Sequence, residues 1–318
     1  MTISKNLMTP SMEIWIRNIC RSVVREELRN AMASAAPNTA DVTLLVEAPA
    51  PVAVPPTLEV SIRQALTSIV REELGQTPPQ GDDFFSQIFE MAPLSGDYVE
   101  FGVFRGASLT KAFFACRDWV RRLESGRIDH LVSDPRQVRE RVTQLWQKRR
   151  FWGFDSFEGM PEPEGVDRER VVWQKGTFAS PLDTLWQKLA DAGVDLDKVV
   201  AIKGFFADAL TESRRRELGI EKVAVAHVDS DLYESAKLAL AFVTPALQNG
   251  TVIVFEEWFA YRGHPLQGEQ RAFGEWRAEN VDWLVTDYHS AGVAAKAFIV
   301  NHRSRRTEFR DRLAEITE

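Results

Sequence analysis

The sequence predicts an α/β protein in which a doubly wound, mostly parallel sheet of seven strands follows an N-terminal helical arm. From about Gly81 onward, apolar runs typical of strands alternate with helical segments, which is the pattern of a parallel sheet with helices on both faces. The last two runs are joined by a stretch short enough for a hairpin. Because a parallel connection needs roughly a dozen residues or more, this hairpin predicts one antiparallel edge strand.

The seven expected strands are short apolar runs. They cover residues 97–103, 150–155, 198–204, 222–229, 250–257, 281–287 and 294–300. Helical segments such as SLTKAFFACRDWVRRL and ESAKLALAFVTPAL separate the first five. A charged insertion at residues 120–150 is expected to be helical and exposed, and its basic face is either solvated surface or a means of steering an anionic substrate.

Two similar segments precede this domain. IRNICRSVVREEL, from Ile16, and IRQALTSIVREEL, from Ile62, both place apolar residues at helical spacing. The stretch between them is rich in Ala and Pro, as linkers are. We therefore expect a helical arm at 1–36, a linker at 37–57, a second amphipathic helix at 58–80 and the main domain at 81–318. These helices either cover the main domain or join copies of the chain into a homo-oligomer.

The composition argues against several classes of protein. The net charge of −7 over 318 residues is unlike that of a general nucleic-acid binder, which needs a basic surface. No apolar run is long enough to span a bilayer, and no secretion signal is visible, so we expect a cytoplasmic protein. Cys20 and Cys116 lack the spacing of metal ligands and are expected to be reduced thiols.

Glycines and acids gather where the predicted strands end, which is the edge at which doubly wound sheets bind ligands. After the first strand, Gly102 and Gly106 stand in the spacing acid-x-Gly-x-x-x-Gly rather than G-x-G-x-x-G. This spacing suits a ligand with an amino-acid head, and Ser108 can cap the following helix. After the second strand, Asp155 can accept hydrogen bonds from ribose hydroxyls, or else it belongs to a turn or a helix cap.

The third predicted strand ends in IKGFFADAL. Phe206 and its neighbours could flank an adenine ring, and Asp208 could accept a hydrogen bond from the adenine amino group. The alternatives are that the phenylalanines are core residues and that Asp208 caps a helix.

Four carboxylates follow the fourth and fifth predicted strands: Asp229, Asp231, Glu256 and Glu257. Carboxylates held together either raise one another's pKa values or share a cation. An oxygen-only set of ligands is the kind that Mg²⁺ prefers. The alternative is that Asp231 caps the next helix while the glutamates are solvated.

A series of motifs resembles a known family. VEFGVFRGASL, FWGFDSFEGMPEP, KGTF, IKGFFADAL, HVDSDLYES, GTVIVFEEW and GEQRAF occur in order between about Gly96 and Trp276. Together they are similar to the macrocin O-methyltransferase family of class I S-adenosylmethionine-dependent methyltransferases. Characterised members methylate sugar hydroxyls on macrolide and aminocoumarin antibiotics. The resemblance implies a seven-stranded, Rossmann-like methyltransferase fold, bound S-adenosylmethionine and, in the antibiotic enzymes, Mg²⁺.

The resemblance also assigns residues. It places Asp229 on the metal with Glu256 and Glu257, and it makes Asp231 the general base. The candidate residues for binding S-adenosylmethionine, from the resemblance and the strand ends together, are Glu100, Gly102, Gly106, Ser108, Asp155, Ser156, Phe157, Phe206, Asp208 and Asp229.

The acid pair departs from the family pattern. The antibiotic enzymes carry two aspartates where this chain has Glu256 and Glu257, so an ion would sit in a shifted position, bind more weakly or be absent. His264 is a candidate second base or hydrogen-bond donor, or else a solvated loop histidine. Glu269 and Arg271 are candidates for ordering the loop over the site.

The expected function is an S-adenosylmethionine-dependent O-methyltransferase, assisted by a divalent cation, that acts on a hydroxyl of a sugar, a glycosylated small molecule or a glycan. One alternative is a metal-independent methyltransferase for another small molecule. Another is a non-catalytic protein that binds the cofactor or acts as a scaffold. The sequence leaves the acceptor open among a macrolide, a surface polysaccharide and a free nucleotide sugar.

Overall fold

The structure is a computed structural model that describes residues 83–126, 134–169, 174–291 and 294–304. The expected arm at 1–36, the linker at 37–57 and the second helix at 58–80 lie outside the described residues, as does Cys20. Cys116 is a buried free thiol. None of the helices in the described part is long and apolar enough to span a membrane.

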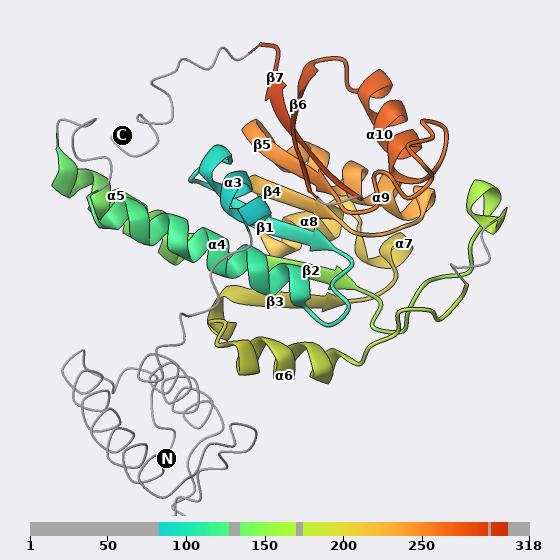
Figure 1. Cartoon of the computed structure of the whole chain (residues 1–318), viewed down its shortest axis with the longest axis horizontal. Coiled ribbons are helices and arrows are strands. Elements are labelled where there is room, and N and C mark those ends of the chain that lie inside the picture. The colour runs from blue at the N-terminus through green and yellow to red at the C-terminus, as the bar shows by residue number, and fades with distance from the viewer. Residues whose placement is uncertain (1–82, 127–133, 170–173, 292–293, 305–318) are drawn as a thin grey trace, which may run out of the picture. The chain divides into compact units, whose positions relative to one another are not determined.

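One sheet of seven strands organises the described residues, in the order β3-β2-β1-β4-β5-β7-β6 (Figure 1). The predicted α/β class and the seven strands are confirmed. The strands are β1 (Asp97–Phe101), β2 (Phe151–Asp155), β3 (Val199–Lys203), β4 (Val223–Val228), β5 (Leu247–Phe255), β6 (Trp283–Ala291) and β7 (Ala295–His302). Strands β1 to β5 pair in parallel, and β7 pairs antiparallel with both β5 and β6.

The order of the last two strands differs from the expected one. The hairpin forms, but its antiparallel strand, β7, lies inside the sheet and β6 is the edge. Burial explains the order, because β7 buries Ala297, Phe298 and Val300 while β6 has no buried residue. The more apolar strand therefore takes the position that is covered on both faces.

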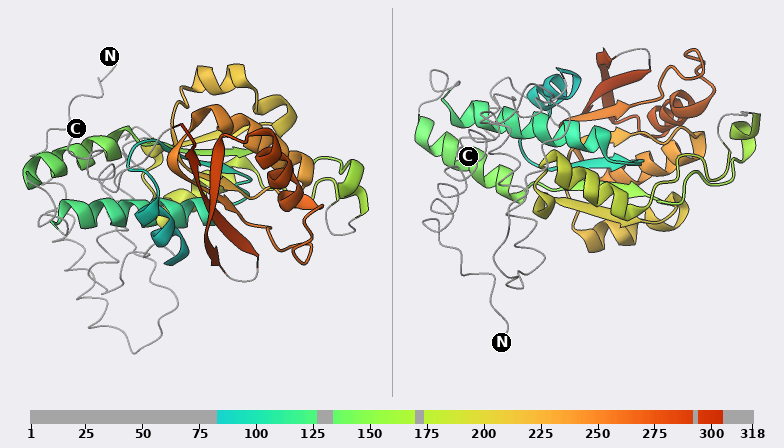
Figure 2. Two further views of the ribbon diagram at one scale, coloured as in Figure 1. Left: turned by 90° about the horizontal axis from the view of Figure 1, so that it is seen from above. Right: turned by 60° about the horizontal axis from the view of Figure 1, so that its bottom comes forward.

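Helices cover both faces of the sheet (Figures 1 and 2). Helices α3 (Asp83–Met91), α4 (Ala107–Glu124) and α6 (Leu182–Ala192) pack in one core cluster with strand residues such as Tyr98 and Val225. Helices α9 (Tyr233–Val243) and α10 (Gly268–Glu279) pack in a second cluster with Val99 and Ala226, from the opposite face. The remaining helices are α5 (Pro135–Lys148), α7 (Phe206–Ala209), α8 (Glu212–Leu218), η2 (Gly165–Glu169), η3 (Leu196–Lys198) and η4 (Thr244–Ala246).

The charged insertion at 120–150 contains the end of α4 and all of α5, which lie alongside each other (Figures 1 and 2). Val120, Leu123, Val138 and Val142 form a small apolar cluster between the two helices. Asp134 caps α5 by accepting hydrogen bonds from two backbone N–H groups. The insertion is thus a helical extension with its own contacts rather than part of the sheet.

Strand β1 lies between β2 and β4, so the strand order reverses beside it. Such a switch point leaves a crevice at the carboxyl ends of the strands, where doubly wound sheets bind ligands. The fold therefore brings the segments that follow β1, β2, β4 and β5 to one edge.

Candidate functional site

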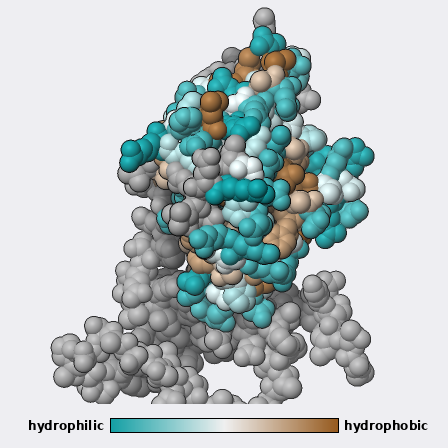
Figure 3. Space-filling view, turned by 90° about the vertical axis from the view of Figure 1, so that its right-hand side faces the viewer, coloured by the Kyte–Doolittle hydropathy of each residue, from teal (hydrophilic) through white to brown (hydrophobic). Residues whose placement is uncertain are grey.

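A cavity of about 690 Å³ opens at the carboxyl ends of β1, β2, β4 and β5. Figure 3 shows the side of the molecule toward which these strand ends point, where apolar side chains lie beside strongly hydrophilic ones. The cavity is lined by Gly102, Phe104, Asp155, Ser156, Gly159, Met160, Pro161, Glu162, Glu164, Asp167, Phe178, Phe205, Phe206, Ala207, Asp229, Ser230, Asp231, Leu232, Glu234, Ser235, Leu238, Glu256 and Glu257. Its size is in the range of small-molecule sites.

Gly102 allows the ends of β1 and β4 to approach each other. Its φ is +91°, and a Cβ at this position would lie 1.8 Å from the backbone oxygen of Asp229. Only glycine therefore fits where the chain leaves β1. Gly106, at the start of α4, also has a positive φ of +80°, but its Cβ position lies 2.5 Å from the Cδ1 of Leu185, at the end of a side chain that can move.

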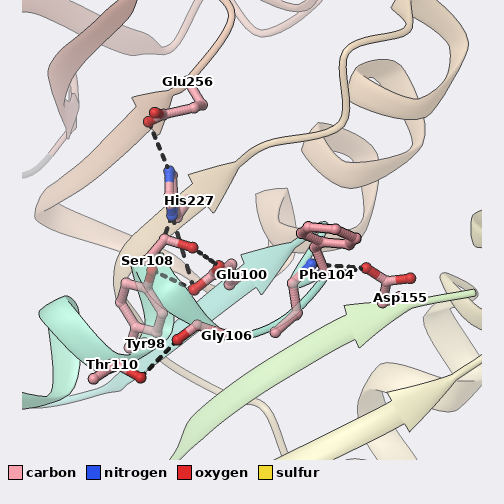
Figure 4. A network of polar contacts seen from close by, with 10 residues as sticks. Tyr98, Glu100, Phe104, Gly106, Ser108, Thr110, Asp155, His227 and Glu256 are labelled. Atoms are coloured by element: carbon pink, nitrogen blue, oxygen red, sulfur yellow. Dashed lines mark hydrogen bonds and ion pairs between the residues drawn. The ribbon is translucent and has the colours of Figure 1, made fainter. Parts of the chain in front are cut away.

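Asp155, at the end of β2, holds the loop that follows β1 (Figure 4). Its Oδ2 accepts hydrogen bonds from the backbone N–H groups of Val103 at 2.9 Å and Phe104 at 2.8 Å. Its Oδ1 accepts from the N–H of Phe157 at 2.7 Å. A carboxylate has about four acceptor positions, so one remains for a ligand hydroxyl.

Glu100 and Ser108, both expected near the cofactor, bond to each other outside the cavity lining. Glu100 is fully buried and accepts hydrogen bonds from Ser108 Oγ and, at 2.7 Å, from Tyr98 Oη. Tyr98 Oη also lies 2.9 Å from His227 Nδ1 (Figure 4). Because the tyrosine donates its one hydrogen to Glu100, it accepts from Nδ1–H, which places a proton on that nitrogen.

His227, the last but one residue of β4, is fully buried next to the acids. Its Nε2 lies 3.5 Å from Glu256 Oε2. Burial lowers the pKa of His227, but hydrogen bonding toward Glu100 and Glu256 outweighs burial and raises the pKa to about 10. The contact with Glu100 runs through Tyr98, since Nδ1 and Oε2 are 3.9 Å apart. His227 is therefore a buried cation, which the sequence analysis did not identify.

All four predicted acids, Asp229, Asp231, Glu256 and Glu257, line the cavity. Asp231 has a left-handed backbone, with a φ of +58°. Burial, then Glu257 and Glu256, raise its pKa to about 7. Burial also raises the pKa of Asp229 well above its usual range, against the opposing charge of His227 and with further increases from Asp231 and Glu256. Besides burial, the acids thus raise one another's pKa values.

Glu269 is a fifth carboxylate of this region. It is 1% exposed, and its Oε2 accepts a hydrogen bond from the backbone N–H of Glu257 at 3.0 Å. Its Oε1 has no hydrogen-bond partner among the described residues. Burial, then Asp229, Asp231 and Glu257, raise its pKa well above the usual range. Glu269 fixes the backbone of the acid pair, a more specific role than the loop ordering expected from sequence.

Asp167, in η2, fastens the loop of residues 156–169 to α9. It is 1% exposed and accepts hydrogen bonds from the backbone N–H groups of Tyr233 at 3.1 Å and Glu234 at 3.5 Å. These groups lie at the start of α9, where N–H groups lack partners within the helix. The contact joins positions 66 residues apart, so sequence spacing gave no signal of it.

Two phenylalanines form an aromatic wall of the cavity. Phe104, after β1, and Phe178 have ring centroids 6.1 Å apart in an edge-to-face arrangement, and Phe178 is 54% exposed. Phe206 also lines the cavity and packs edge-to-face on Phe101.

Several predicted site residues lie away from the cavity. Asp208 and His264 are exposed and do not line it, and His264 Nδ1 accepts a hydrogen bond from the N–H of Leu266 at 3.3 Å. Phe157 packs in the core, whereas its neighbour Ser156 lines the cavity. Arg271 bonds to Glu275 at 2.9 Å rather than reaching the acids. Within the described ranges, no three His, Cys, Asp or Glu side chains are grouped so that they could hold a metal ion.

Comparison with known proteins shows which family part of the chain resembles. The family model "Macrocin-O-methyltransferase (TylF)" matches residues 142–282, which include the acids at the ends of β2, β4 and β5. The resemblance to the macrocin O-methyltransferase family is confirmed.

The chain is also similar to the 8-demethyl-8-(2,3-dimethoxy-alpha-L-rhamnosyl)-tetracenomycin-C 4'-O-methyltransferase of Streptomyces olivaceus, to which it is 36% identical over 115 residues. That alignment covers 35% of this chain and 42% of the relative, so the chain spans less than half of the relative's length. The solved structure of the O-methyltransferase NovP has a TM-score of 0.51 at 18% identity and covers 77% of this chain and 99% of NovP. This likeness shows that the sheet and its helices form an α/β fold shared with a methyltransferase.

Proposed function

We propose that this protein is an S-adenosylmethionine-dependent O-methyltransferase whose acceptor is a hydroxyl of a sugar or a glycosylated small molecule. One observation carries the proposal: the segment that matches the family lines a cavity at the switch point of the sheet and supplies its acids. The tetracenomycin relative methylates a rhamnosyl group, which supports a sugar as the acceptor.

The volume of the cavity and three features of its lining support S-adenosylmethionine as the cofactor. Gly102 leaves space that any side chain would fill, and Asp155 retains an acceptor position suited to a ribose hydroxyl. Phe205 and Phe206 line the wall where an adenine ring can stack. The cofactor, when bound, supplies an electrophilic methyl group on a sulfonium.

Asp231 is our candidate for the general base. A sugar hydroxyl is a poor nucleophile at neutral pH, so loss of its proton to a nearby carboxylate lowers the barrier. Asp231 lines the cavity, and a pKa of about 7 suits a base that works near neutrality. The protein's remaining task is to hold the hydroxyl in line with the methyl group, since positioning contributes much of the rate of such displacements.

Divalent-cation assistance is the second part of the proposal. Its support is the set of oxygen donors on Asp229, Glu256 and Glu257, which is the kind that Mg²⁺ prefers. As arranged, the described side chains do not fit an ion, because no three are grouped to hold one and Glu256 faces His227. The proton transfer to Asp231 proposed above therefore does not depend on a metal ion.

The test uses the full chain with S-adenosylmethionine and a panel of glycosides, and it measures formation of S-adenosylhomocysteine and of methylated product. We expect turnover in the wild type and a loss of about 100-fold or more in Asp231→Asn, the effect typical of removing a general base. Cofactor binding without methylation of any glycoside would refute the proposal. Unchanged turnover after EDTA treatment would refute cation assistance alone.

A further inference from the structure

We propose that Ser235 binds the acceptor by recognising a hydroxyl next to the one that is methylated. This inference rests on the proposed function and narrows the acceptor to sugars that have two neighbouring hydroxyl groups. It is based on the place of Ser235 in the lining of the cavity, and on polar groups after β4 that have no hydrogen-bond partner among the described residues.

Ser235 is in the first turn of α9, on the side of the helix that lines the cavity. It is 9% exposed, and because it lines the cavity, the part of it that remains accessible faces the cavity. Leu238, about one turn further along α9, also lines the cavity, whereas Ala236 and Ala239 pack in the core. The fold therefore presents this serine to the space in which a ligand binds.

The polar groups of Ser235 are not used by the surrounding protein. Asp167 accepts hydrogen bonds from the backbone N–H groups of Tyr233 and Glu234, the two residues that precede Ser235. Neither the N–H nor the hydroxyl of Ser235 has a hydrogen-bond partner among the described residues. Buried polar groups without partners destabilise a fold, so a ligand that supplies a partner binds favourably here.

Ser230 supports the same interpretation. It lines the cavity between Asp229 and Asp231, and its Oγ is buried without a hydrogen-bond partner among the described residues. The Ser230 carbonyl accepts from the N–H of Leu232 at 2.5 Å, which makes a γ-turn with a positive φ of +58° at Asp231. Such a turn is rare and strained, and strain of this kind is typical of functional sites. The proposed base thus stands between two serines whose hydroxyls lack partners.

These groups match the chemistry of a sugar. Hydroxyls on neighbouring ring carbons lie close together, so when one gives its proton to Asp231, its neighbour lies beside the same segment of the chain. A hydroxyl both donates and accepts hydrogen bonds, as the N–H and Oγ of Ser235 require. The groups proposed above for the ribose and adenine follow β2 and β3, whereas Ser235 belongs to the segment that carries the proposed base. We therefore assign it to the acceptor rather than to the cofactor.

The experiment measures kcat/KM of the full chain for methyl rhamnoside or methyl glucoside, whichever is turned over faster, and for the monodeoxy analogues of that glycoside. Analysis of the product shows which hydroxyl is methylated. For the wild type, we expect kcat/KM to fall about tenfold when a hydroxyl adjacent to the methylated one is missing, the effect of one lost hydrogen bond that leaves a buried group unpaired.

Ser235→Ala should turn over the parent glycoside and this deoxy analogue with nearly equal kcat/KM, because the hydrogen bond is absent with both. Its affinity for S-adenosylhomocysteine, measured by calorimetry, should stay within about twofold of the wild type, since one hydrogen bond to the acceptor is all that it loses. The matched control is Ser213→Ala, in the first turn of α8, whose residue is exposed and does not line the cavity. This control should keep the tenfold preference.

An unchanged preference in Ser235→Ala would overturn the proposal, as would a wild type that methylates every deoxy analogue as fast as the parent glycoside. A fall in the affinity of Ser235→Ala for S-adenosylhomocysteine as large as the fall in kcat/KM would assign the serine to the cofactor and would also overturn it. Absence of methylation of any glycoside by the wild type would refute the proposed function, and this inference with it.

Discussion

Replacement of Gly102 by alanine should lower the free energy of unfolding of the domain by forcing the ends of β1 and β4 apart. The new Cβ would lie 1.8 Å from the Asp229 oxygen, and the φ of +91° is unfavourable for any L residue. The conformation costs about 1–2 kcal/mol, and forcing the overlapping atoms apart costs about 1–3 kcal/mol more. A loss of about 3 kcal/mol in the free energy of unfolding corresponds to a fall of roughly 6–12 °C in Tm for a domain of this size.

Gly219→Ala is the matched control. Gly219 ends α8 with a φ of +71°, but nothing lies within 4 Å of its Cβ position, so alanine there carries only the conformational cost of about 1 kcal/mol. Thermal unfolding followed by circular dichroism compares the two variants, and calorimetry gives their affinity for S-adenosylmethionine. Only Gly102→Ala should lose affinity. Equal falls in Tm would refute the argument that the approach of β1 to β4 requires glycine.

Three further variants test the acids around the cavity. In Asp231→Asn, Tm should exceed that of the wild type above about pH 7, because the raised pKa of Asp231 means that its ionisation destabilises the fold progressively between about pH 4 and 7. The gain in Tm should vanish when unfolding is repeated near pH 4. A gain that stays constant with pH would contradict the raised pKa. Glu269→Ala removes the hydrogen bond to the backbone of Glu257 and should lower the free energy of unfolding by about 1–3 kcal/mol, whereas Glu269→Gln keeps the bond. Equal urea midpoints for the two variants would show that Glu269 does not hold the backbone of the acid pair. Asp167→Ala should lower the free energy of unfolding by about 1 kcal/mol and expose the loop of residues 156–169 to proteolysis. The control Asp134→Ala removes a comparable helix cap from α5 and should leave that loop protected.

Much of the fold could be predicted because its signals are local. The alternation of apolar runs and helices gave the class and all seven strands. The rule that ligands bind at the carboxyl ends of strands led to Gly102, Asp155 and the acids after β4 and β5, all of which line the cavity. The hairpin was also predicted, but the choice of β7 over β6 for the interior position depended on how the two strands compete for burial.

Other parts of the site depend on side-chain direction, which sequence spacing does not give. Asp208 and His264 stand close to site motifs in the sequence, yet both are exposed away from the cavity. His227 stands in an apolar run and has the pattern of a core residue. Its role emerges only because the parallel register sets it beside Glu100 while its other nitrogen faces Glu256.

The sequence by itself therefore determined which strands form and which acids follow them, since periodicity and strand ends are properties of neighbouring residues. The tertiary structure alone decided that His227 and Glu269 are buried against those acids, and that Asp167 draws a distant loop onto α9. The physical reason is that the burial of a side chain and its distance from other charged groups depend on strand order and on contacts between distant segments. Those contacts set the pKa values of the acids in the cavity, on which the proposed base depends.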